Sequence, residues 1–229
     1  MAGQALHAGA RLAPLAEEVR PIVVKLGGSV VRSGELPAWL DAIAASPRPI
    51  IVVPGGGALA DEVRACQASL GFGDAAAHRM ALLAMDQLAW AVAGLRPGFA
   101  VGATEGDLQA ALDRGSVAVW APYALIAGRT DIEESWRLTS DSLALWLATR
   151  VGASRYYLIK SILRQKTRLS AEQLSRDGII DEAFLAMLKD AFVPAFLLGR
   201  GDQEAFSASL ARVEDCGAEI DWLKYRVEN

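Results

Sequence analysis

Residues 21–32 have the sequence PIVVKLGGSVVR, in which an apolar, strand-like run leads into a lysine and then two glycines. Adjacent glycines let the backbone turn tightly and bring its N–H groups close to an anion. Lys25 supplies a point charge of the kind that a transferring phosphoryl group requires. In the P-loop the lysine follows the glycines, so this stretch is not a P-loop. It indicates a phosphate-binding turn, and its simpler alternative is an ordinary strand-to-helix turn with a solvated lysine.

Apolar runs of strand length alternate with helical patterns along the rest of the chain. Strands are predicted at 21–26, 49–53, 99–102, 116–120, 155–159, 195–198 and 218–220. Helices are predicted at 36–45, 58–70, 75–95, 105–113, 140–150, 181–189 and 203–213. This alternation predicts an α/β protein, a three-layer αβα sandwich with a central, mainly parallel sheet. We expect residues 1–20 to form a flexible leader and residues 21–229 to form one domain.

The composition excludes several classes of protein. The net charge is −4 and no basic stripe is present, so nucleic acid is not an expected partner. Two cysteines far apart and two histidines form neither a disulfide framework nor a zinc-ligand pattern. No apolar run reaches the roughly 18 residues that a membrane span needs. We therefore expect a cytoplasmic globular protein that holds any anionic substrate with a local cluster of positive charge.

Three of the predicted strands end in glycine-rich or basic residues. Lys25 and the glycines follow the first, a triple glycine at 55–57 follows the second, and Lys160-Ser161 follow a later one. Ligands of parallel sheets bind at the carboxyl ends of the strands. If these three strands are parallel, their ends meet at one edge of the sheet and can share a ligand.

Two glycine motifs in combination resemble those of the amino acid kinase family. They are VVKLGGSV and IIVVPGGGALADEV, and a third segment, WRLTSDSLALWLA at 136–148, resembles the part of the family in which an aspartate opens a helix. The resemblance covers roughly residues 21–220. Within the family, AHRMALLAMDQLAW and LIKS at 158–161 resemble the kinases of methanofuran-type cofactor synthesis. Those kinases form a diphosphate from ATP and an aminomethyl-furanmethyl phosphate.

The resemblance implies a role for each motif residue. The implied catalytic residues are Lys25, Asp141 and Lys160. The implied ATP-phosphate ligands are Gly27, Gly28, Ser29 and Ser161, and the implied acceptor ligands are Gly55, Gly56, Gly57 and His78. ATP is the implied phosphoryl donor, with Mg²⁺ carried by ATP rather than by a protein site. The acceptor is a small phosphorylated or carboxylated molecule, and the resemblance implies a homodimer or larger homo-oligomer.

For several of these residues, a purely structural role is the alternative. Asp141 could be a helix-start carboxylate that interacts only with the helix dipole, and His78 could be a structural histidine. The basic residues Arg164, Lys166 and Arg168 are expected to be a solvated face rather than nucleotide ligands.

Two other functions remain open from the sequence. One is a uridylate kinase or another kinase of this fold, although many uridylate kinases carry an arginine where this chain has ALAD at 58–61. The other is a non-catalytic protein that binds a nucleotide or oxyanion.

Overall fold

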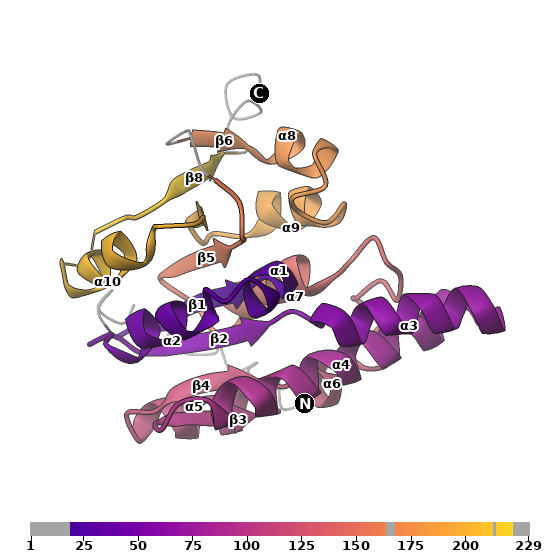
Figure 1. Ribbon diagram of the computed structural model, residues 1–229, viewed down its shortest axis with the longest axis horizontal. Coiled ribbons are helices and arrows are strands. Elements are labelled where there is room, and N and C mark those ends of the chain that lie inside the picture. Colours follow the sequence, from indigo (N-terminus) through magenta and orange to yellow (C-terminus); the bar gives the residue numbers. More distant parts are fainter. Residues whose placement is uncertain (1–18, 164–167, 213, 222–229) are drawn as a thin grey trace, which may run out of the picture.

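Strands of this protein assemble into one mixed sheet in the computed structural model, which describes residues 19–163, 168–212 and 214–221. The strands are β1 (Ile22–Leu26), β2 (Ile50–Pro54), β3 (Phe99–Gly102), β4 (Val117–Trp120), β5 (Arg155–Ile159), β6 (Arg168–Ser170), β7 (Ala195–Leu198) and β8 (Ala218–Asp221). Their order across the sheet is β3-β4-β2-β1-β5-β7-β8-β6 (Figure 1). Neighbouring strands are parallel except β7 and β8, which are antiparallel. The predicted α/β fold with a mainly parallel sheet is confirmed.

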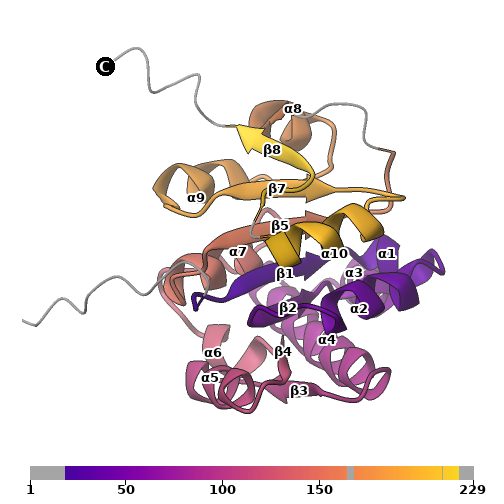
Figure 2. The same ribbon diagram turned by 90° about the vertical axis from the view of Figure 1, so that its left-hand side faces the viewer.

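Helices connect these strands and cover both faces of the sheet. They are α1 (Gly28–Arg32), α2 (Leu36–Ala44), α3 (Gly57–Leu70), α4 (Asp74–Gly94), α5 (Glu105–Asp113), α6 (Tyr123–Ile126), α7 (Ser140–Arg150), α8 (Ala171–Arg176), α9 (Phe184–Asp190) and α10 (Gln203–Arg212). Figure 2 shows α7 and α9 on one side of the sheet and α2 and α10 on the other. In Figure 1 the α3–α4 pair extends beyond the edge of the sheet.

Alternation along the central strands produces the two faces. Val23 belongs to a buried cluster with residues of α7 and α9, whereas Ile22 and Val24 belong to a second cluster with residues of α2 and α10. Successive side chains of a strand point to opposite faces, so Lys25 lies on the same face as Val23. That face is the one covered by α7, which packs against β1.

The structure corrects several predicted elements. Residues 28–32, expected to be part of a turn, form the short helix α1, and Arg168, expected in a loop at 163–168, begins the edge strand β6. The predicted helix at 181–189 begins later, at Phe184, because Asp181 accepts a hydrogen bond from the Phe184 N–H and so precedes the helix. The short helices α6 and α8 were not predicted. Arg164, Lys166 and most of the expected leader lie outside the described residues.

Candidate active site

The three strands whose ends carry the sequence motifs are adjacent at the centre of the sheet. β1 lies between β2 and β5 and is parallel to both. In this register Leu26 stands beside Pro54 and Ile159, so the chain leaves all three strands at the same level. The expected meeting of these motifs at one edge is confirmed. The candidate site is built at this edge, where the carboxyl ends of parallel strands bind ligands.

Two lysines meet one aspartate at this edge. The Lys25 Nζ lies 2.5 Å from Asp141 Oδ1, and the Lys160 Nζ donates to Asp141 Oδ2 over 2.8 Å. Lys25 comes from β1, Lys160 follows β5, and Asp141 lies in the first turn of α7. The Lys25 and Asp141 side chains are only 3% and 4% exposed, whereas that of Lys160 is 18% exposed. The carboxylate therefore holds both ammonium groups in one place, with Lys160 nearer to solvent.

Burial and charge oppose each other in this cluster. Burial lowers the pKa of Lys25 to about 8, against the attraction of Asp141. Burial by itself raises the pKa of Asp141, but the ammonium groups of Lys25 and Lys160 outweigh it and hold that pKa below its usual value. The aspartate is therefore ionised at neutral pH, and Lys25 is protonated below about pH 8. The cluster carries one net positive charge, which suits a bound polyphosphate.

A second, half-buried carboxylate fixes the start of α7. Asp181 accepts hydrogen bonds from the backbone N–H groups of Thr139 and Ser142 and from both of their hydroxyls. The Thr139 side chain does not cap the helix itself, so Asp181 acts as the cap from 42 residues away. On the same turn, the Tyr156 hydroxyl donates to the Asp141 carbonyl oxygen over 3.2 Å. These contacts set the position from which the Asp141 carboxylate reaches the lysines.

Glycines allow the turns after β1 and β2 to approach each other. A Cβ on Gly28 would lie 2.9 Å from the Gly57 Cα, and one on Gly27 would lie 2.9 Å from the Ile159 carbonyl oxygen. Gly57 also has a φ of 52°, in the left-handed region that favours glycine. Gly55 lies beside Ser140 and Gly28, so the turns and the start of α7 share one small volume. The glycines serve close packing as well as any ligand.

Serines link the turns after β1 and β5. The Ser161 N–H donates to the Ser29 Oγ over 3.3 Å, and the Ser161 hydroxyl donates to Glu35 over 2.8 Å. Arg200, just after β7, donates to the same Ser161 hydroxyl over 2.9 Å. The structure thus brings both serines of the expected ATP-phosphate group beside Lys160.

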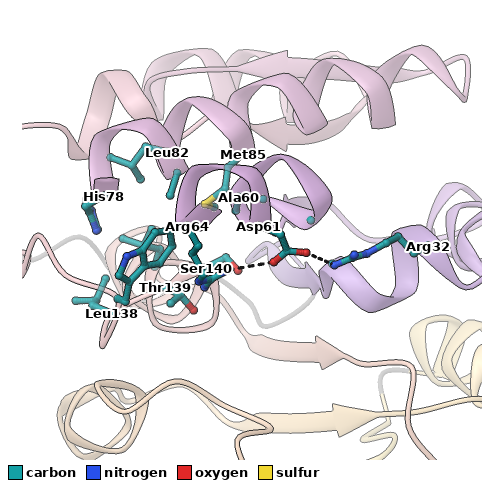
Figure 3. Close-up of a pocket in the computed structure, with 17 residues that line it drawn as sticks. Arg32, Ala60, Asp61, Arg64, His78, Leu82, Met85, Leu138, Thr139 and Ser140 are labelled. Atoms are coloured by element: carbon teal, nitrogen blue, oxygen red, sulfur yellow. Dashed lines mark hydrogen bonds and ion pairs between the residues drawn. The ribbon is translucent and has the colours of Figure 1, made fainter. Parts of the chain in front are cut away.

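A pocket of about 170 Å³ opens beside the glycine turns (Figure 3). Gly28, Gly55, Gly56 and Gly57 line it. Three of them, Gly55, Gly56 and Gly57, belong to the expected acceptor group. His78 lines the same pocket from α4. In Figure 3 the His78 side chain and the Arg32 side chain lie at opposite ends of the labelled group. The residues expected to bind the acceptor are therefore brought together.

Several pocket residues were not found from the sequence. Arg32 and Arg64 both pair with Asp61, over 2.6 Å and 3.1 Å, and form a charged rim. The Arg64 guanidinium also lies 4.0 Å from the centre of the Trp136 ring, and the Trp136 indole lines the pocket. A single arginine or tryptophan carries no motif, so only the three-dimensional arrangement identifies these residues. Asp181, which lies outside the pocket, is predicted from the sequence only as the first residue of the helix at 181–189. Its contact with Thr139 spans 42 residues and has no local motif.

Within residues 19–163, 168–212 and 214–221, no three His, Cys, Asp or Glu side chains gather closely enough to hold a metal ion. No helix in these ranges combines the length and apolar character needed to cross a membrane.

The sequence model of the amino acid kinase family matches residues 20–162, which include β1, β2, β5, Asp141 and Lys160. The match spans more than half of the chain. The protein belongs to the amino acid kinase family. The family resemblance expected from the glycine motifs is thereby confirmed.

A protein with an assigned kinase name is similar to part of this chain. A protein of Methanocaldococcus jannaschii named [5-(aminomethyl)furan-3-yl]methyl phosphate kinase is 28% identical over 129 residues, which are 55% of this chain and 58% of that protein. The aligned region thus spans little more than half of the relative.

Solved structures share the fold. A uridylate kinase from Archaeoglobus fulgidus superposes with a TM-score of 0.66 at 20% identity, covering 87% of this chain and 99% of that one. A UMP kinase from Bacillus anthracis superposes with a TM-score of 0.64 at 14% identity, covering 88% and 96%.

Proposed function

We propose that the protein is an ATP-dependent kinase that transfers a phosphoryl group to the phosphate of a small phosphomonoester and so forms a diphosphate. The best candidate for the acceptor is a furanmethyl phosphate. Family membership supports a kinase, and the name of the Methanocaldococcus jannaschii relative supports this class of acceptor.

The observation that carries this proposal is the pair of lysines on one buried aspartate. Phosphoryl transfer needs alignment and charge neutralisation more than covalent help from the protein. Lys25 and Lys160 stand at the ends of neighbouring parallel strands, 2.5 Å and 2.8 Å from Asp141. A protein that only binds an oxyanion has no need of two lysines fixed in this way, which argues against the non-catalytic alternative.

Lys25 and Lys160 act on different parts of the reacting group. An oxygen of the acceptor phosphate forms a bond to the γ-phosphorus as the bond from that phosphorus to the bridging oxygen of ADP breaks. Lys25 neutralises charge on the moving phosphoryl group, and Lys160 neutralises charge that develops on the ADP side. Asp141 keeps both ammonium groups in place and remains ionised because its pKa is held low.

The described residues fit ATP carrying its own cation. Mg²⁺ commonly binds through substrate phosphates with few protein ligands, and it supplies charge neutralisation when bound. Asp141 is the carboxylate at the centre of the site, and both of its oxygens face lysines.

Next to Ser161, a second pocket of about 300 Å³ is bordered by Ile162, Leu163 and Leu169. We propose that this pocket binds the nucleoside of ATP.

Size and charge support a one-ring phosphomonoester in the pocket beside the glycine turns. An engineered protein cavity of about 150 Å³ holds one benzene molecule, so a pocket of about 170 Å³ suits a single ring. The acceptor phosphate would lie at the start of α3, a helix of 14 residues whose first N–H groups have no intrahelical partner. Arg32 and Arg64 exceed Asp61 by one positive charge at the rim.

Uridylate kinase is the second candidate, since uridylate kinases share the fold. A nucleoside monophosphate contains a base and a ribose, so it needs more room than one ring. The absence of an arginine at 58–61 also counts against it.

A panel of acceptors tests the proposal. ATP consumption and ³¹P spectra of the products should be measured with the furanmethyl phosphate, UMP, isopentenyl phosphate and acetylglutamate. We expect diphosphate formation with the furanmethyl phosphate at a kcat/KM at least about 10²-fold above that for UMP. A preference for UMP would establish the uridylate kinase alternative. If no acceptor accelerates ATP loss, the kinase proposal fails.

A further inference from the structure

His78 lines the pocket, and one of its buried hydrogen-bonding atoms is unused. It lies in the second turn of α4, it is only 5% exposed, and it lines the pocket at the end away from Arg32 (Figure 3). Its Nε2 has no hydrogen-bond partner among the residues that the structure describes. Buried polar atoms nearly always have a partner, so an orphaned one in a pocket points to a ligand.

The protonation of the ring makes Nε2 an acceptor. Burial lowers the pKa of His78, against a hydrogen bond to the Ser135 backbone and the nearby Glu134 carboxylate. Glu134 is itself paired with Arg79, and the charge of Arg79 also lowers the pKa of His78. The imidazole is therefore neutral near pH 7. Since Nε2 has no partner, Nδ1 makes the Ser135 bond by donating to the carbonyl oxygen, which leaves a lone pair on Nε2.

The surroundings of this nitrogen are mostly apolar. Leu82, Met85 and Leu138 line the pocket and are buried. The charged groups at the rim, Arg32 and Asp61, already satisfy each other over 2.6 Å. A ligand that fills the pocket thus meets the glycine turns, the charged rim at Arg32, apolar walls, and His78 at the end away from Arg32.

We propose that His78 Nε2 accepts a hydrogen bond from a donor group on the acceptor substrate, at the end of the molecule opposite its phosphate. The substrate class is then a one-ring phosphomonoester that carries an amino or hydroxyl group. This inference rests on the proposed function, because it assigns a specificity-determining residue to the same site. The name of the Methanocaldococcus jannaschii relative contains an aminomethyl group, which belongs to this class.

Three acceptors that differ at one substituent test the inference. The full chain should be assayed with ATP and with furanmethyl phosphates bearing an aminomethyl, a hydroxymethyl or a methyl group. A site built to hydrogen-bond a substrate donor rejects the analogue that lacks it. We expect kcat/KM for at least one donor-bearing acceptor to exceed that for the methyl analogue about 10- to 100-fold. The better of the two donors identifies the group as amine or hydroxyl.

Variants then locate the preference at residue 78. In His78→Phe we expect the ratio between donor-bearing and methyl acceptors to fall below about 2, through a higher KM for the donor-bearing acceptor. The KM for ATP should not change. His78→Gln retains an acceptor oxygen and should recover part of the ratio. Met80→Ala changes an exposed residue on the same helix and is the matched control. Thermal denaturation checks that each variant is folded.

Failure of this inference differs from failure of the proposed function. Equal kcat/KM for all three acceptors in the wild type, or an unchanged ratio in folded His78→Phe, overturns the inference and leaves a working kinase. If the wild type turns over none of them, the proposed acceptor class fails. Calorimetric titration with benzyl phosphate and its aminomethyl and hydroxymethyl derivatives then decides about His78. Affinities that are equal in the wild type, or unchanged in His78→Phe, overturn the inference.

Discussion

Lys25 combines deep burial with a charge that the proposed chemistry requires. It follows three strand residues that are fully buried, and its side chain is 3% exposed. Burial lowers its pKa to about 8, so the ammonium form dominates below that pH and the neutral amine above it. Asp141, whose pKa is held low, stays ionised across the neutral range. The lysine proposed to act in transfer therefore titrates within about one unit of neutral pH.

The pH dependence of activity should report this titration. Because the free enzyme loses the Lys25 charge as pH rises through about 8, kcat/KM for ATP should decline above that pH. The phosphates of bound ATP favour the ammonium form, so kcat should persist to higher pH than kcat/KM. Rates measured from pH 6 to 10 check both statements.

The control for the pH profile is Lys25→Arg. Its guanidinium stays charged throughout this range, so its profile should be flat even if its rate is lower. A wild-type kcat/KM that does not change between pH 7 and 10 would contradict the low pKa of Lys25.

At the scale of the element, α7 depends on a cap from a distant part of the chain. Asp181 receives four hydrogen bonds from Thr139 and Ser142 and a fifth from the Phe184 N–H. Burial raises the pKa of Asp181, and the Asp141 charge raises it further. Both effects disfavour the ionised carboxylate, and the hydrogen-bond donors around it stabilise that ionised form. The first turn of α7 carries Asp141, and hence the cap also controls the geometry of the two lysines.

Asp181→Ala should therefore damage both stability and activity. Loss of the cap costs about 1–2 kcal/mol, and donors left without a partner cost about 1–3 kcal/mol, so we expect a total of about 2–5 kcal/mol. Misplacement of Asp141 should lower kcat about 10- to 100-fold. Chemical denaturation and steady-state assays measure the two effects. Glu182→Ala, at the exposed neighbouring position, is the control. A change in stability under about 0.5 kcal/mol would show that Asp181 is not the cap.

At the scale of the whole molecule, the sequence predicts the sheet better than it predicts the pocket. The parallel strands follow from buried apolar runs, and the meeting of Lys25 and Lys160 follows from motifs at the strand ends. The place of Asp141 beside them follows from the family resemblance. Their roles in catalysis stay predictions. Asp181 reaches α7 across 42 residues, and no local pattern encodes such a contact.

The pocket and the surface illustrate the same limit. Arg64 is positioned by its packing on Trp136, 72 residues later in the chain. No spacing rule could predict this contact. On α4, Leu83 and Trp90 are 44% and 69% exposed, whereas Leu82 and Met85 line the pocket. The expected homo-oligomer stays a prediction.

The most direct test of the account is transfer of label from [γ-³²P]ATP to the furanmethyl phosphate by the wild type and by Lys25→Ala. The account predicts labelled organic diphosphate from the wild type and a kcat at least about 10²-fold lower in the variant, as when one preorganised electrostatic contact is lost. Circular dichroism must show that the variant is folded. A folded Lys25→Ala that transfers label at the wild-type rate would contradict the assignment of this site to phosphoryl transfer.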